Sequence, residues 1–85
     1  MKKTILLLLV GNRKEDAVKV QEILTEFGWL IKTRLGIHDG VMQNSSDSGL
    51  IVLEIVGTEE QNKEFASKFS AFSTVSTKLV DLKVE

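Results

Sequence analysis

Residues 5–10, ILLLLV, decide how the chain that begins MKKTILLLLVGNRKE is interpreted. A secretory signal needs an apolar core of about 7–15 residues followed by small residues at a cleavage site. Here the apolar run has six residues, ends at Gly11 and is followed by charged residues. A membrane-spanning helix needs about 20 apolar residues. We therefore predict a buried β-strand, no membrane association and a cytoplasmic location.

The composition of the chain restricts its class. At 85 residues, we expect a single domain covering residues 1–85. The absence of cysteine excludes disulfides and thiolate metal sites. Eleven basic and twelve acidic residues are interspersed along the chain, whereas nucleic-acid-binding proteins concentrate lysine and arginine on one face. We expect no direct nucleic-acid partner.

Two helices are predicted from capping signals followed by apolar residues at helical spacing. Asn12 and Glu15 have the spacing of a capping box, and the apolar stripe after them is Ala17, Val20, Leu24 and Phe27. Thr58 and Gln61 form a second such box, and the stripe that we predict to be buried after them is Asn62, Phe65, Ala66 and Phe69.

Four strands are predicted around these helices. They are the apolar run 5–10, the alternating segment 29–38, the apolar run 50–56 and the alternating segment 75–80, with a polar turn-rich loop at 39–49. The order β-α-β-β-α-β is that of the ferredoxin-like split βαβ unit, an α+β fold. We predict a four-stranded antiparallel sheet of order 4-1-3-2 with both helices on one face.

The two central strands are apolar on both faces, although helices cover only one face of such a sheet. We assign five side chains to the helix-free face as a candidate oligomer interface: Leu6, Leu8, Val10, Leu50 and Val52. Exposed apolar patches of this size usually mark an interface, which favours a homodimer or homotetramer. The alternative is an outer face that is merely hydrophobic or is shielded by the loop at 39–49.

Three segments carry a family resemblance: ILLLLVGNRKEDAVKVQEILTEFGWLIKTRLGI, GLIVLEIVG and FASKFSAFSTVSTKLVDL. They resemble ACT-like ferredoxin domains, and they are similar to the small regulators associated with the iron-only hydrogenase system. The shared features are the Asn12-Arg13 step, the Arg34-Leu35-Gly36 step and the segment Ser73–Lys78. The resemblance implies an oligomeric module that acts as a transcriptional or metabolic regulator.

The resemblance also implies a relation in fold to the C-terminal domain of nickel-responsive repressors. Those repressors bind DNA through a separate arm and bind nickel through several histidines and a cysteine. This chain has His38 as its one histidine, no cysteine and no residues left over for such an arm. We expect no metal site, no cofactor and no direct DNA binding.

Two places are candidate ligand sites. Asn12 and Arg13, next to Gly11, lie at a predicted helix start, where free backbone N–H groups favour anions; simple capping with a solvated arginine explains them equally. Gly36 and His38, on the second strand with Lys32 and Arg34, would form a weak anion-binding groove. The alternative there is an edge strand whose charges oppose aggregation.

No catalytic motif supports an enzyme. The chain has no cysteine nucleophile, no Gly-x-Ser-x-Gly elbow and no Gly-rich phosphate loop. We expect a non-enzymatic, homo-oligomeric regulatory module that binds a small ligand or a protein partner at a subunit interface. The alternative is an interaction protein that docks on a partner through its apolar sheet face and binds no small molecule.

Overall fold

A computed structural model describes residues 1–11, 14–38 and 49–85. The elements follow one another along the chain as β1 (Lys2–Val10), α1 (Lys14–Glu26), the 3₁₀ turn η1 (Gly28–Leu30), β2 (Ile31–His38), β3 (Gly49–Ile55), α2 (Glu59–Ser67), the 3₁₀ turn η2 (Lys68–Ala71) and β4 (Val75–Lys83). This order confirms the predicted ferredoxin-like βαββαβ fold. The predicted loop at 39–49 lies, apart from Gly49, outside the described residues.

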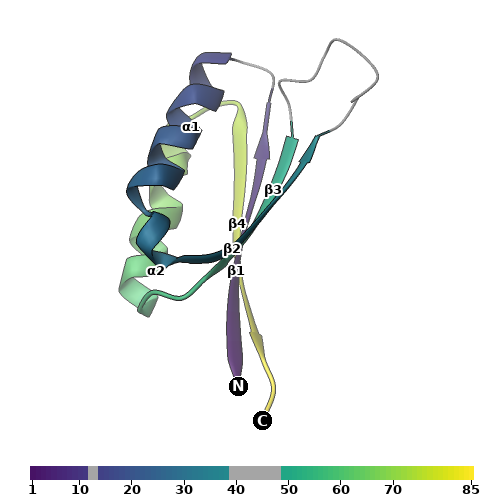
Figure 1. The fold of residues 1–85 in the computed structure, drawn as a ribbon, viewed down its shortest axis with the longest axis vertical. Coiled ribbons are helices and arrows are strands. Elements are labelled where there is room, and N and C mark those ends of the chain that lie inside the picture. The colour runs from purple at the N-terminus through teal and green to yellow at the C-terminus, as the bar shows by residue number, and fades with distance from the viewer. Residues whose placement is uncertain (12–13, 39–48) are drawn as a thin grey trace.

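The sheet is antiparallel with the order β2-β3-β1-β4, which is the predicted order read from the opposite edge. Both helices pack on the same face of this sheet, and among the described residues the other face carries no helix (Figure 1). The apolar run at 5–10 therefore lies in a central strand, paired with β3 on one side and β4 on the other. Within the described residues, no helix is long and apolar enough to cross a membrane.

The core lies between the sheet and the helices. Leu6, Leu8 and Leu53 from the central strands are fully buried there. They meet an aromatic cluster in which the Phe65 ring lies 5.0 Å from Phe27 and 5.4 Å from Phe69, measured between ring centroids. Burying such side chains supplies most of the free energy that stabilises a domain of this size.

The prediction that Leu6, Leu8 and Val10 lie on the helix-free face is wrong. Leu6 pairs with Leu53 and Leu8 with Ile51, and all four side chains are buried beneath the helices. Strand alternation shows that two sets of residues point in opposite directions, but when both sets are apolar it does not show which set meets the helices. The apolar residues of β1 that point away from the helices are Ile5, Leu7 and Leu9.

Strand β2 carries an irregularity that changes which of its residues share a face. Ile31 pairs with Ile55, but Thr33 pairs with Glu54, so Lys32 is an extra residue in the ladder. A bulge of this kind shifts the side-chain alternation by one position. Ile31 consequently faces the helices, whereas Leu35, which pairs with Val52, faces away from them.

Candidate functional site

The helix-free face of the sheet is mainly aliphatic. Leu9, Leu35 and Leu82 are 52%, 54% and 58% exposed. Pairing across the sheet places half-buried aliphatic residues between them, and together we call this set the outer face: Ile5, Leu7, Leu9, Leu35, Leu50, Val52, Val80 and Leu82. Of the predicted interface residues, Leu50 and Val52 therefore do lie on the helix-free side.

An ion pair borders the outer face. Lys3 on β1 points to the same side of the sheet as Ile5, and its Nζ lies 3.0 Å from Oε2 of Glu54 on β3. The hydrogen bond from Lys3 lowers the pKa of the Glu54 carboxyl below its ordinary value, and the charge of Lys32 adds to this. The same hydrogen bond, together with the charge of Glu54, raises the pKa of Lys3.

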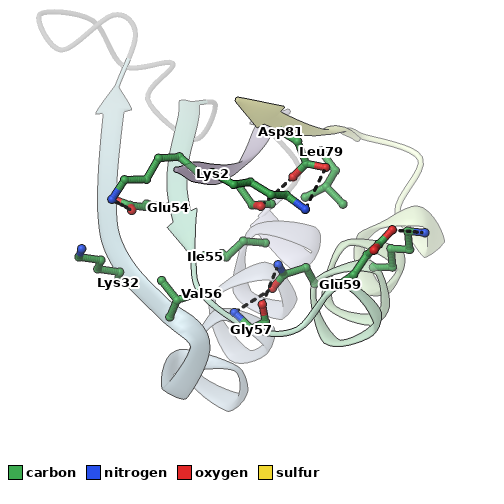
Figure 2. A pocket seen from close by; sticks show the side chains of 13 residues that line it. Lys2, Lys32, Glu54, Ile55, Val56, Gly57, Glu59, Leu79 and Asp81 are labelled. Atoms are coloured by element: carbon green, nitrogen blue, oxygen red, sulfur yellow. Dashed lines mark hydrogen bonds and ion pairs between the residues drawn. The ribbon is translucent and has the colours of Figure 1, made fainter. Parts of the chain in front are cut away.

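A cleft of about 330 Å³ lies at the end of the sheet where β1 begins and β3 leads into α2. We call it the end cleft, and Figure 2 shows the side chains around it. Its charged residues come from all four strands and α2: Lys2, Lys3, Lys32, Lys63, Glu54, Glu59 and Asp81. Its remaining lining is Thr4, Ile55, Val56, Gly57, Asn62 and Leu79.

One wall of the end cleft is a polar contact between the two strands that hold the chain termini. Thr4, which is 9% exposed, donates a hydrogen bond from Oγ1 to Oδ1 of Asp81 at 2.7 Å. The other carboxylate oxygen of Asp81 is 3.9 Å from Nζ of Lys2. This distance is at the outer limit of an ion pair, and both side chains are about half exposed, so Lys2 is only weakly held.

The opposite wall is the start of α2. The predicted capping box is confirmed: Gln61 donates its backbone N–H to Oγ1 of Thr58 at 3.1 Å, and Thr58 donates its own to Oε1 of Gln61 at 2.9 Å. One helical turn further, Lys63 lies 3.2 Å from Glu59. The capping box fixes where the helix begins, and therefore where Asn62 and Lys63 meet the cleft.

The predicted helix-start site is only partly described, because Asn12 and Arg13 lie outside the described residues. Gly11, next to them, donates its backbone N–H to the carbonyl oxygen of Thr74 at 2.7 Å. Thr74 in turn donates from Oγ1 to Oδ2 of Asp16 at 2.6 Å. The Gly11 amide is therefore committed within the fold and is not a free donor for an anion.

Gly36 and His38 lie away from the end cleft. Gly36 pairs with Ile51, and a methyl group added to it would meet no atom within 4 Å. His38 is the last residue of β2, and its side chain is outside the described part of the structure. The end cleft is reached instead by Lys32, at the other end of the same strand. Arg34, between them, donates a hydrogen bond to Oε1 of Gln21 on α1.

Sequence reasoning did not identify the lysines of the end cleft. The Lys2-Lys3 pair precedes the apolar run at 5–10 without forming a binding motif, and Lys32 enters the sequence prediction only in the weak groove with Gly36 and His38. These residues form no sequence motif, because they lie on different elements, and the fold alone brings them together. Among the described residues, no group of three or more histidine, cysteine or acidic side chains could hold a metal ion.

No protein-family model matches the sequence, and no curated protein matches it either. Among solved structures, the chain is similar to the uncharacterized protein TM1266 from Thermotoga maritima, with 26% identity and a TM-score of 0.81 over 98% of this chain and 100% of that one. It is also similar to CPII from Thiomonas intermedia K12, a nitrogen regulatory PII-like protein. The apo form gives 22% identity and a TM-score of 0.53 over 98% of this chain and 90% of that one. The form of CPII bound to ADP, AMP and acetate gives 21% identity and a TM-score of 0.51 over 99% of this chain and 88% of that one. These similarities establish that the chain shares the fold of those proteins.

Proposed function

We propose that this chain is a homo-oligomeric, non-enzymatic regulatory module that assembles through its outer face and binds a small ligand or a protein partner at a subunit interface. The observation that carries the proposal is the aliphatic outer face, with Leu9, Leu35 and Leu82 each more than half exposed. Exposed apolar patches of this extent on soluble domains mark interaction surfaces.

The size of the outer face suits a second copy of the chain. Four strands about 4.8 Å apart, each about eight residues long at about 3.3 Å per residue, make a face of about 500 Å². Two such faces in contact bury about 1,000 Å², which is the lower bound of a specific protein–protein interface. This area supports a dimer that forms and dissociates with concentration, as a regulated assembly requires.

Ligand binding is supported by the similarity in fold to CPII, which binds ADP, AMP and acetate. A regulatory module of this kind works by a shift of population between two assembly states, and the ligand acts only if it binds one state more tightly. The resemblance to regulators of the iron-only hydrogenase system supports a role in transcriptional or metabolic control in the cytoplasm. A measured change in hydrogenase transcripts upon deletion of the encoding gene would test that role.

The self-association is tested by light scattering coupled to size exclusion over a range of protein concentrations. We expect a mass above that of the monomer that rises with concentration, and we expect Leu35→Glu to return the chain to a monomer. Val18→Glu is the matched control, because Val18 is 58% exposed, close to the 54% of Leu35, but lies on α1, on the far side of the sheet. A monomeric wild-type chain would overturn self-association and leave docking on a different protein through the same face.

A further inference from the structure

The positive charge in the end cleft is unevenly distributed. Glu54 is flanked by Lys3, whose Nζ is 3.0 Å away, and by Lys32 on the neighbouring strand (Figure 2). Within the described residues, Lys32 forms no ion pair of its own, and its charge acts on Glu54. In the described part of the chain, Glu54 is therefore in ion-pair contact with Lys3 alone and Lys32 has no direct counterion, which leaves about one positive charge uncompensated at this end of the sheet.

Asp81, the other carboxylate that the strands contribute to the cleft, does not neutralise this excess positive charge. Asp81 already accepts the Thr4 hydroxyl at 2.7 Å, and Lys2 lies 3.9 Å from it. Lys2 is held only weakly there, because exposed ion pairs are worth little. The remaining pair, Lys63 with Glu59, lies within one turn of α2 and is balanced by itself.

The shape and lining of the cleft indicate what would fill it. Its volume of about 330 Å³ is at the small end of the range for small-molecule sites. Ile55, Val56 and Leu79 supply an apolar portion of the lining beside the lysines. Lysine ammonium groups bind phosphate and carboxylate oxygens as point charges. The match is a small organic molecule with an acidic group at one end.

We propose that the end cleft binds a small oxyanion, a phosphate or carboxylate group, with Lys3 and Lys32 as direct contacts. The inference rests on the proposed regulatory function, since it names the chemistry of the ligand. Glu54 competes with the ligand for Lys3, so removing its charge should strengthen binding.

The test is calorimetric titration of the full chain with inorganic pyrophosphate, inorganic phosphate and acetate, at constant ionic strength. Lys32→Ala should weaken binding of the preferred anion about tenfold, as expected for loss of one charge-assisted contact. Glu54→Gln should tighten it. Lys78→Ala is the matched control: Lys78 pairs with Leu7 on the same side of the sheet but does not line the cleft. It should leave affinity unchanged within about twofold, because screening by salt weakens distant charges.

Absence of saturable binding by all three anions would overturn the inference, as would an equal loss in Lys32→Ala and Lys78→Ala, which would indicate unspecific attraction to surface charge. The relative affinities for phosphates and acetate decide which oxyanion is preferred. Light scattering on the same samples separates this inference from the proposed function. An oligomer that binds no anion contradicts the inference alone, and a monomer that binds one contradicts the proposed self-association alone.

Discussion

The side-chain amide of Asn62 holds both backbone polar groups of Gly57. The Gly57 N–H donates to Oδ1 of Asn62 at 3.1 Å, and Nδ2 of Asn62 donates to the Gly57 carbonyl oxygen at 3.2 Å. Asn62 is buried, so these bonds satisfy a polar group that would otherwise be costly inside the fold. The pair fixes the turn between β3 and α2, which forms one side of the end cleft.

Gly57→Ala should destabilise the protein by roughly 1–3 kcal/mol, the usual cost of inserting a methyl group into packed structure. The new Cβ would lie 2.8 Å from Oδ1 of Asn62 and 3.2 Å from Gln61 atoms, so the amide must move and its bonds must weaken. Urea unfolding measures the change. Gly36→Ala is the control, because no atom lies within 4 Å of its added methyl group. Equal losses in the two variants would contradict the role of the close approach.

Phe65→Ala should lower the free energy of unfolding by about 3–5 kcal/mol, the range for removing a buried aromatic side chain. Phe65 is fully buried and contacts both other rings of the core cluster. The measurement is again a denaturant transition. Val18→Ala, on the exposed surface of α1, should change it by no more than about 0.5 kcal/mol. A small effect of Phe65→Ala would mean that the core repacks without the ring.

Thr4→Val should cost about 1 kcal/mol, since it removes a hydrogen bond to a carboxylate while keeping the shape of the side chain. The Asp81 side chain is 54% exposed, so water can replace the lost donor and limit the effect. Thr33→Val, at an exposed position of β2, provides the comparison. If both variants unfold at the same denaturant concentration, the Thr4–Asp81 contact contributes nothing to stability.

The Lys3–Glu54 pair predicts a pH dependence whose direction follows from the pKa changes. The pKa of Glu54 is lowered from 4.5, so its contribution to stability is present above that value and is lost as the pH falls through the lowered pKa. The pKa of Lys3 is raised from 10.5, so its contribution is present below that value and is lost as the pH rises through the raised pKa. Carbon-detected NMR titration of the Glu54 carboxyl should show a midpoint that moves up in Lys3→Met. An unmoved midpoint would show that the pair does not form in solution.

The general arrangement of the fold could be predicted because local signals agree with one another. The capping box at Thr58–Gln61 and the helical spacing of Phe65 and Phe69 place α2, and the apolar run at 5–10 identifies a central strand. The orientation of that strand could not be predicted, because each of its faces is aliphatic and only the register with β3 decides which one meets the helices. The bulge at Lys32 is likewise not visible in the period-two pattern of the sequence. It places Ile31 and Leu35 on opposite faces of the sheet.

The end cleft could not be predicted for a different reason. Lys2, Lys32 and Asp81 are distant in sequence and carry no motif, and they come together only because β1 lies between β3 and β4 in the sheet. At the predicted helix-start site, the sequence also could not show that the Gly11 amide is taken up by a long-range hydrogen bond to the carbonyl oxygen of Thr74. A local sequence pattern cannot predict such a hydrogen bond, because the acceptor residue lies far from the donor along the chain.

Lys3 and Glu54 belong both to the border of the outer face and to the lining of the end cleft. If a second copy on the outer face changes how tightly the end cleft holds an oxyanion, thermodynamic linkage requires the oxyanion to change the free energy of association by the same amount. The apparent affinity for the anion would then depend on the concentration of the protein itself. A cell could therefore set the sensitivity of this module by how much of it is made, with no change in any residue.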